Sequence, residues 1–195
     1  PTRSTRFTAA PCRSPPTSKV SRPELTVAVV GCDGDGFSIG LGHLSHAIRR
    51  NVPIMYAVLD NGIYGLTKGQ SSPTTERNLK RSLGLTGTDE RPLNPVFLVL
   101  SAGCGFVART HAGNLPHLRE MFREALRYPG FAFVHVLAAC ATYQPLQYAE
   151  ELFQRCDLLP PDHDAADFGS ACAVVLDRRF KLGMIYRRRA GETPT

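Results

Sequence analysis

Several patterns are missing from this chain of 195 residues, and each absence excludes a class of protein. No two cysteines are spaced as CxxC, which excludes a self-contained zinc or redox motif, and six scattered cysteines are too few for a disulfide-dense secreted scaffold. The longest uncharged stretch, 129–148, carries two prolines and several polar residues, so it predicts no transmembrane helix. The first residues include arginine and proline but no apolar run, so we expect no secretory signal and a cytoplasmic location.

The charge is biased towards positive but does not indicate nucleic-acid binding. Lysine and arginine number 23 against 17 aspartate and glutamate residues, and much of the excess lies near the two ends, as in the run 187–189. Nucleic-acid surfaces combine basic with aromatic side chains, and these basic clusters contain few aromatics. We therefore expect neither a nucleic-acid nor a membrane partner, and the basic ends are either solvated or attract an acidic protein.

Composition predicts three regions. Residues 1–24 are rich in Pro, Ser, Thr and Arg without an apolar period, so we expect an irregular segment there. Residues 25–141 are expected to form the core, because an apolar fraction of 43% over the whole chain suffices for one globular domain. Residues 142–195 show only a short amphipathic turn near 148–155 and a strand-like piece at 182–188, and are expected to pack on the core as a C-terminal extension.

Within the core, buried strands alternate with helical stretches. Strands are expected at 25–31, 53–60, 105–110 and 131–140, and helices at 37–50, 94–103 and 114–128. This alternation predicts an α/β fold with a doubly wound, mostly parallel sheet flanked by helices on both faces.

Two polar turns follow the first two predicted strands, CDGDG at 32–36 and DNGIYG at 60–65. In a doubly wound sheet, ligands bind outside the carboxyl ends of the strands. A dinucleotide does not fit, because the glycines are not spaced as GxGxxG and the carboxylates of Asp33 and Asp35 would repel its pyrophosphate. An EF-hand does not fit either, because Leu44 occupies the position that requires glutamate.

The remaining interpretation is a hard divalent cation held by few protein oxygens and by phosphate oxygens of a ligand, as magnesium usually is. Asp33 and Asn61 would supply side-chain oxygens, and the turn after Asn61 a backbone carbonyl. The two turns therefore predict a magnesium–phosphate site.

The stretch GDGFSIGLGHLSHAIRRNVPIMYAVLDNGIYGLTKGQSSPTT (34–75) resembles the β subunit of the 2-oxoacid:ferredoxin oxidoreductases, and among these the 2-oxoglutarate type. Its most specific part is IYGLTKGQSSPTT at 63–75. Further family landmarks are matched in order at 94–110, 117–126, 130–140 and 182–188. The resemblance spans about residues 23–189 and implies the thiamine diphosphate-binding fold in an N-terminally truncated chain.

The resemblance also implies roles for individual residues. Asp33, Asn61 and the backbone carbonyl of Ile63 would bind Mg²⁺. The backbone that cradles the diphosphate of thiamine diphosphate would be that of Gly34, Asp35, Gly65 and Leu66. His43 and Lys68 are weaker candidates for contact with the substrate, because a packed histidine and a solvated loop lysine are common without any function.

Cys140 stands where the family has one ligand of a four-iron–four-sulfur cluster. Such a cluster needs four thiolates, and the family's other ligands belong to an N-terminal segment that this sequence does not match, so we expect no cluster on this chain alone. Residues 8–19 stand where the family has a different stretch, which suggests the hypothesis of a frameshifted start.

The implied activity is oxidative decarboxylation of a 2-oxoacid, 2-oxoglutarate in preference to pyruvate, to an acyl-CoA. The implied partners are an α subunit, ferredoxin, the 2-oxoacid and coenzyme A. Because a glutamate of the partner subunit normally activates the aminopyrimidine in this family, the isolated chain is expected to be inactive. Two alternatives stay open, a non-oxidative thiamine diphosphate decarboxylase or carboligase and a catalytically incompetent truncated module.

Overall fold

The computed structural model describes residues 24–77, 89–189 and 191. The expected irregular segment at 1–24 therefore lies outside the described residues, apart from Glu24. No helix in the described residues is long and apolar enough to cross a membrane.

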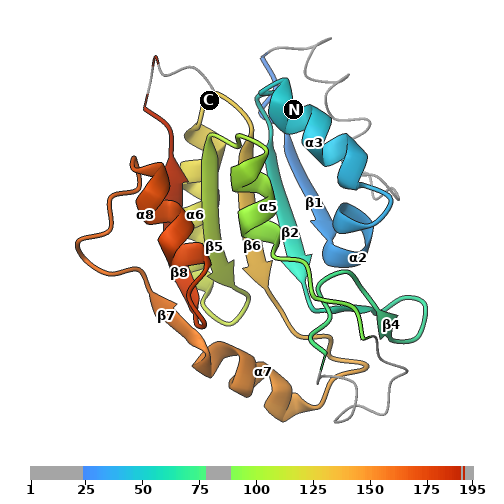
Figure 1. Ribbon diagram of the computed structural model, residues 1–195. Helices are drawn as coiled ribbons and strands as arrows, with labels where there is room; N and C mark the ends of the chain where they lie inside the picture. Colours follow the sequence, from blue (N-terminus) through green and yellow to red (C-terminus); the bar gives the residue numbers. More distant parts are fainter. Residues whose placement is uncertain (1–23, 78–88, 190, 192–195) are drawn as a thin grey trace.

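A six-stranded sheet forms the centre of the molecule (Figure 1). Across the sheet the strands follow the order β1 (Ala28–Cys32), β2 (Met55–Asp60), β6 (Ala132–Leu137), β5 (Phe106–His111), β8 (Phe180–Arg187) and β7 (Cys156–Leu158). The first four strands are parallel, β8 is antiparallel to β5, and β7 is parallel to β8. The carboxyl ends of the four parallel strands therefore meet at one edge of the sheet, at the bottom of Figure 1.

Helices cover both faces of the sheet, as the sequence predicts. The larger core cluster joins one face to α2 (Asp33–Phe37), α3 (Leu41–Arg49), α5 (Pro95–Ser101) and α8 (Phe168–Val175). On the other face α6 (Leu115–Arg127) packs against β2, β5 and β6, and it lies behind the sheet in Figure 1. The mostly parallel α/β fold with helices on both faces is thus confirmed.

Local sequence explains where these elements begin. The central strands β2 and β6 are almost fully buried, as expected for apolar strands packed on both faces. Asn94 and Asn114 each cap a helix, since their side-chain oxygens accept from the backbone of Phe97 and His117. A proline follows each cap at the first turn, where its missing N–H costs nothing.

The first helix differs from the prediction. The sequence predicts one helix at 37–50 after an open turn, whereas helical structure already begins at Asp33, stops at Phe37 and resumes at Leu41. The chain bends sharply at Gly40, whose N–H donates to the Asp35 carbonyl at 2.9 Å. A Cβ atom at Gly40 would lie 2.5 Å from that carbonyl oxygen, so only glycine fits this bend.

The region after residue 141 contains more structure than its sequence pattern indicates. It forms α7 (Leu146–Gln154), β7, α8 and β8. Strand β8 pairs with β5 along the sheet, and its residue Ile185 is fully buried in the larger core cluster. Helix α8 escapes prediction because its sequence, FGSACAVV, is apolar or small on nearly every side and shows no amphipathic period.

Candidate functional site

The turns after β1 and β2 meet at the carboxyl edge of the sheet. Asp33 is the first residue of α2 and its side chain is completely buried. The backbone N–H of Asn61 donates to Asp33 Oδ1 at 3.4 Å, and the N–H of Ile63 donates to Asn61 Oδ1 at 3.0 Å. The structure therefore brings together the three residues that the sequence predicts as magnesium ligands, while the metal itself stays a prediction.

The loop 61–63 is held in place from several sides. Gly62 has a φ of 68°, which favours glycine, and its N–H donates to Asp60 Oδ1 at 3.1 Å. The Thr75 hydroxyl donates to the Gly62 carbonyl, and Gln144 Nε2 donates to the Asn61 carbonyl at 2.7 Å. Because these bonds all come from the chain itself, binding of a ligand would require little further ordering of the backbone.

Two buried carboxylates share one hydroxyl at the centre of the site. Thr74 Oγ1 lies 2.7 Å from Asp60 Oδ1 and 3.1 Å from Asp33 Oδ2. A hydroxyl has a single proton, so it can donate to only one of the two at a time. Burial, followed by repulsion from the Asp60 charge, raises the pKa of Asp33 above its usual range. A cation beside Asp33 would relieve this unfavourable charge, so the oxygen donors and their electrostatics fit Mg²⁺.

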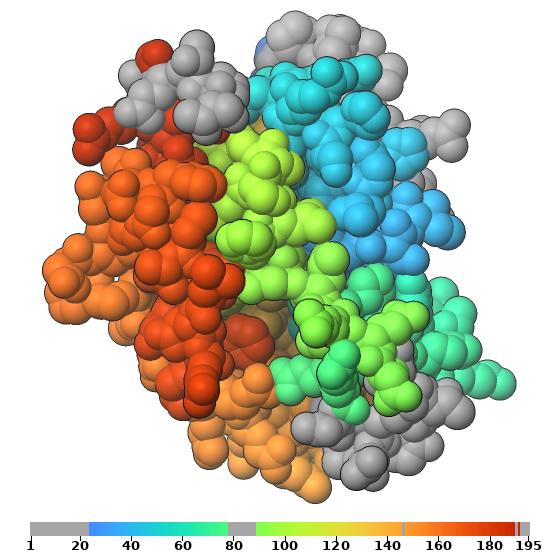
Figure 2. Space-filling view, viewed as in Figure 1, coloured from blue at the N-terminus to red at the C-terminus, as the bar shows by residue number. Residues whose placement is uncertain are grey.

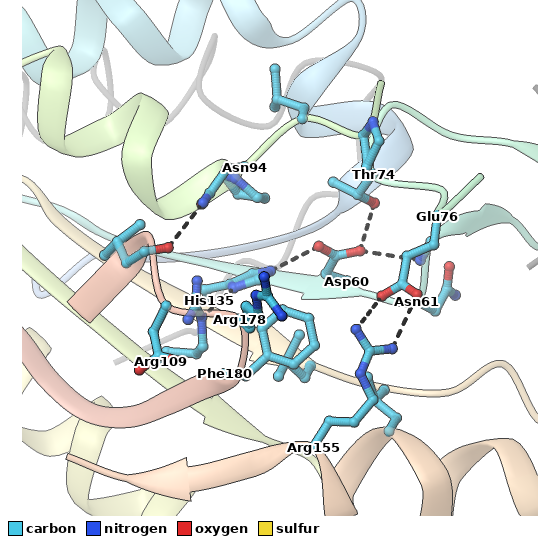
Figure 3. Close-up of a pocket in the computed structure, with 18 of the residues that line it drawn as sticks. Asp60, Asn61, Thr74, Glu76, Asn94, Arg109, His135, Arg155, Arg178 and Phe180 are labelled. Atoms are coloured by element: carbon cyan, nitrogen blue, oxygen red, sulfur yellow. Dashed lines mark hydrogen bonds and ion pairs between the residues drawn. The ribbon is translucent and has the colours of Figure 1, made fainter. Parts of the chain in front are cut away.

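From Asp60 a chain of hydrogen bonds leads to a histidine and then to an arginine (Figure 3). His135 Nε2 lies 2.8 Å from Asp60 Oδ2, and Arg109 Nε donates to His135 Nδ1 at 3.2 Å. Because Nδ1 accepts a hydrogen bond, the imidazole is neutral and donates through Nε2. Burial lowers the pKa of His135 and favours this neutral form. Burial alone would raise the pKa of Asp60, but the interaction with His135 and the hydrogen bonds from Thr74 and Gly62 together outweigh it and lower that pKa. The positive Arg109 thus compensates the negative Asp60 through a neutral ring.

An aromatic ring lies directly on the turn that would face the diphosphate. Tyr64 donates from its hydroxyl to the Gly34 carbonyl at 3.0 Å. A Cβ atom on Gly34 would lie 2.4 Å from a carbon of that ring. Gly34 is therefore required by its contact with Tyr64, which is a reason separate from any cofactor.

The other predicted site residues lie around the same turns. Leu66 is fully exposed, and Lys68 is exposed with a φ of 79°. His43 is half-buried on α3, and neither its side chain nor that of Lys68 forms a hydrogen bond or ion pair with the described residues. Asp35 is half-buried, and burial raises its pKa.

Cys140 lies against the loop that follows Asn61. Its Sγ would be 3.4 Å from a Cβ atom on Gly65. Within the described ranges, no group of three or more His, Cys, Asp or Glu side chains is arranged to hold a metal ion. The described residues therefore do not surround Cys140 with the thiolates that a four-iron–four-sulfur cluster needs.

A pocket of about 360 Å³ opens beside the two turns, under the ends of β2, β5 and β6. Its walls come from the loop after β2, from 92–95, from α7 and from the turn between α8 and β8. Figure 2 shows it as a hollow between the orange α7, the red-orange α8–β8 segment and the green loops. The Asp60–His135–Arg109 line forms part of its inner wall.

Fold and site together define a class: a doubly wound α/β domain that places a carboxylate and an amide at adjacent strand ends, where such proteins bind phosphorylated ligands. Residues 17–136 match the family described as thiamine pyrophosphate enzyme, C-terminal TPP binding domain, and the chain belongs to this family.

Within this family, the chain is similar to subunits of 2-oxoacid oxidoreductases. The chain is 41% identical over 146 residues to a 2-oxoacid:ferredoxin oxidoreductase subunit beta of Sulfolobus sp., covering 73% of this chain and 48% of that protein. It is 37% identical over 134 residues to the 2-oxoglutarate synthase subunit KorB of Archaeoglobus fulgidus, covering 69% of this chain and 50% of that protein. The chain thus spans about half the length of the curated relatives it matches.

A solved structure confirms the expected thiamine diphosphate-binding fold. The 2-oxoglutarate:ferredoxin oxidoreductase from Magnetococcus marinus, with 2-oxoglutarate, coenzyme A and succinyl-CoA bound, superimposes with a TM-score of 0.85 at 34% identity. The match covers 92% of this chain and 62% of that chain. The resemblance that the sequence motifs indicate is therefore confirmed.

Several residues of this site escape analysis of the sequence alone. Thr74 lies in the motif 63–75, but nothing in the sequence shows that its hydroxyl joins Asp33 to Asp60. His135 leaves a weak signal, since it is a polar residue inside a strand that is otherwise apolar, and Arg109 leaves a weaker one, because Thr110 and His111 follow it in the same strand. Gln144 leaves none, because it reaches Asn61 across 83 positions of sequence.

Proposed function

We propose that this chain forms the diphosphate-binding part of the β subunit of a thiamine diphosphate-dependent 2-oxoacid:ferredoxin oxidoreductase. The observation that carries the proposal is the meeting of Asp33 and Asn61 at adjacent strand ends of a TPP-binding domain. Similarity to β subunits of such enzymes favours oxidative over non-oxidative decarboxylation. The reaction would convert a 2-oxoacid to an acyl-CoA, and the bound compounds of the similar solved structure favour 2-oxoglutarate over pyruvate.

In this proposal Asp33, Asn61 and the Ile63 carbonyl hold Mg²⁺, and Thr74 positions the Asp33 carboxylate. The diphosphate would lie against the backbone of Gly34, Asp35, Gly65 and Leu66. When bound, thiamine diphosphate supplies a carbon that acts as nucleophile and electron sink. The residues of this chain bind and orient its diphosphate end, and the fixed loop 61–63 keeps the metal-binding oxygens in place.

The other half of the site would come from an α subunit. Ile39 is 76% exposed and Leu66 is 100% exposed, next to the two turns, where apolar side chains suit a protein interface better than water. Asp33 and Asp60, the buried carboxylates here, are both engaged within the site, so we assign the carboxylate that activates the aminopyrimidine to the partner. A cytoplasmic location stays a prediction.

The electrons released in the reaction would pass through an iron–sulfur cluster to ferredoxin. Cys140 would be one cluster ligand in a complete enzyme, and its place beside Gly65 would set the cluster close to the cofactor loop. Anaerobic reconstitution of this chain alone is expected to yield only trace iron. A stoichiometric four-iron centre would contradict this expectation.

The metal site is tested by replacing Asp33 with Ala and comparing Asp35→Ala, which changes a carboxylate in the same turn that is not a proposed ligand. Calorimetry with Mg²⁺ and thiamine diphosphate, in the presence of the α subunit, should show binding abolished by the first change and largely kept by the second. Equal affinity in Asp33→Ala and the unchanged chain would remove Asp33 from the site.

The activity is tested by reduction of a viologen dye with 2-oxoglutarate or pyruvate and coenzyme A. The chain alone is expected to show no turnover, because the carboxylate that activates the aminopyrimidine is assigned to the α subunit and only one cluster ligand, Cys140, is identified on this chain. A complete β subunit paired with its α subunit should reduce the dye, and faster with 2-oxoglutarate. Turnover by this chain alone would refute the composite site, and inactivity of the complete pair would refute the assignment.

A further inference from the structure

Arg109 is a buried cation whose hydrogen-bonding capacity is mostly unfilled. It lies on β5 with 3% of its surface exposed and lines the 360 Å³ pocket (Figure 3). Its Nε donates to His135, and within the described part of the chain neither terminal nitrogen of the guanidinium has an acceptor. A guanidinium carries five N–H donors, so four of them remain for a group inside the pocket. Burying a charged group without such partners is costly.

The acidic side chains that line the pocket do not fill this role, because each already has partners. Asp60 accepts from Gly62, Thr74 and His135. Glu76 forms a two-bond pair with Arg155, at 3.0 and 2.8 Å. Asp177 accepts from the backbone of Arg179 and lies 3.5 Å from the Lys181 ammonium.

A second basic residue adds further N–H donors that are not filled. Arg178 lines the same pocket from the turn before β8 (Figure 3). Its side chain is exposed and makes no hydrogen bond or ion pair with the described residues. The pocket therefore presents terminal N–H donors of two arginines for which the described residues supply no acceptor, and these donors suit the oxygens of an anion.

The remaining walls of the pocket are largely apolar. They are formed by Leu93, Pro95, Leu137, Leu152 and Val175, with the Phe180 ring packed under Arg109 at 5.3 Å from ring centroid to guanidinium carbon. A volume of about 360 Å³ lies at the small end of the usual range for ligand pockets. A planar guanidinium fork matches the two oxygens of a carboxylate.

We propose that this pocket binds a small aliphatic carboxylate, with the carboxylate on the terminal nitrogens of Arg109, Arg178 at the mouth and the aliphatic part against the apolar walls. The site lies against the loop 60–62, and Asp33 is not among the residues that line it. The pocket shares Asn61 and Thr74 with the proposed metal site, but the proposed contacts to the carboxylate come from Arg109 and Arg178, so binding is tested without Mg²⁺ or cofactor.

The test uses 4-methylpentanoate as the probe and its neutral amide, 4-methylpentanamide, as the matched control ligand. Binding to the full chain is followed by calorimetry and by NMR of the backbone amides, without Mg²⁺ or thiamine diphosphate. The carboxylate should bind at least about tenfold more tightly than the amide, as expected for a charge-assisted pair. The backbone N–H signals of Asn61 and Gly62 in the NMR spectrum should shift when the carboxylate binds, because these residues line the pocket.

Three variants locate the carboxylate. Arg109→Lys keeps the charge but loses the two-pronged donor, and it should weaken binding about tenfold. Arg178→Ala, at an exposed position that does not threaten folding, should weaken binding a few-fold. Arg123→Ala, on the exposed side of α6, is the matched control and should leave binding unchanged. Circular dichroism shows whether Arg109→Lys remains folded; if it unfolds, Arg178→Ala alone decides.

The proposal is overturned by no binding of the carboxylate, by equal affinity for the carboxylate and the amide, or by binding that either a folded Arg109→Lys or Arg178→Ala leaves unchanged. Inorganic phosphate is included as a further probe. If phosphate binds more tightly than 4-methylpentanoate, the pocket is a phosphate site and the assignment to a carboxylate is wrong. None of these outcomes bears on the cofactor site, which Asp33→Ala tests separately.

Discussion

Asp33 and Asp60 are both buried at the end of the sheet, and single residues around them decide how two negative charges coexist there. Thr74 lies between the two carboxylates, and His135 with Arg109 compensates Asp60 from the other side. Asp33 alone has no basic partner in this arrangement of described side chains. The charge pattern therefore favours a cation at Asp33 and not at Asp60.

Replacing Thr74 with Val removes the shared hydroxyl while keeping the shape of the side chain. A hydrogen bond to a charged group contributes roughly 1.5–3 kcal/mol, so Mg²⁺-dependent binding of thiamine diphosphate should weaken about tenfold or more. Thr110→Val is the matched control, because that buried hydroxyl bonds to His117 instead. Calorimetry on both variants checks the prediction; equal losses in the two would show a general effect on stability.

Replacing His135 with Gln should change how stability depends on pH. Burial lowers the pKa of His135 in the folded state, so the unfolded chain binds the proton more readily and stability falls as the pH drops below about 6.5. Glutamine still donates to Asp60 and accepts from Arg109 but does not titrate. Urea unfolding at pH 7.5, 6.5 and 5.5 should therefore show a smaller loss in His135→Gln. His46→Gln, on the exposed side of α3, is the control, and parallel curves in all three proteins would contradict the prediction.

At the scale of elements, the site is built where α2 meets the hairpin of β3 (Ile63–Tyr64) and β4 (Gln70–Ser71). The hairpin places Tyr64 on Gly34, and its far side leads to Thr74. These two elements belong to different parts of the chain, and the packing between them aligns the backbone that would face the diphosphate.

Two glycine-to-alanine substitutions distinguish the effect of the Gly34–Tyr64 contact on stability from the effect of helix propensity. In Gly34→Ala the new methyl group would overlap the Tyr64 ring, so we expect a loss of roughly 1–3 kcal/mol in unfolding free energy, together with weaker cofactor binding. In Gly42→Ala on α3 nothing lies within 4 Å, and the change should stabilise the chain by about 0.5–1 kcal/mol. Denaturant unfolding of both variants tests this contrast, and a stabilising Gly34→Ala would contradict the proposed contact.

At the scale of the whole molecule, the region after residue 141 completes the sheet. Strand β8 covers the edge of β5, and Arg188 donates to the Gly103 carbonyl at 2.7 Å. The carboxylate pocket also depends on this region, because α7 and the α8–β8 turn form two of its walls. Without this region, β5 would be an unpaired edge strand and the pocket would lack two of its walls.

Truncating Ile185 on β8 to Ala tests whether this strand belongs to the core. Ile185 is fully buried, so its loss should cost about 2–5 kcal/mol of unfolding free energy. Leu158→Ala on β7 is the matched control, since that side chain is 67% exposed and should change stability by less than about 0.5 kcal/mol. Urea unfolding curves provide the measurement, and similar values for the two variants would show that β8 is only loosely attached.

The sequence was enough to predict the alternation of strands and helices up to residue 137, because buried strands are continuous apolar runs and α6 has a clear apolar face. It also determined that the turns holding Asp33 and Asn61 would meet, since carboxyl ends of parallel strands share one edge of the sheet. Three contacts are visible only in the folded structure: Thr74 joins Asp33 to Asp60, Arg109 reaches Asp60 through His135, and β8 pairs with β5. These contacts join residues far apart in the chain, and no local period or spacing encodes which buried polar groups will become neighbours.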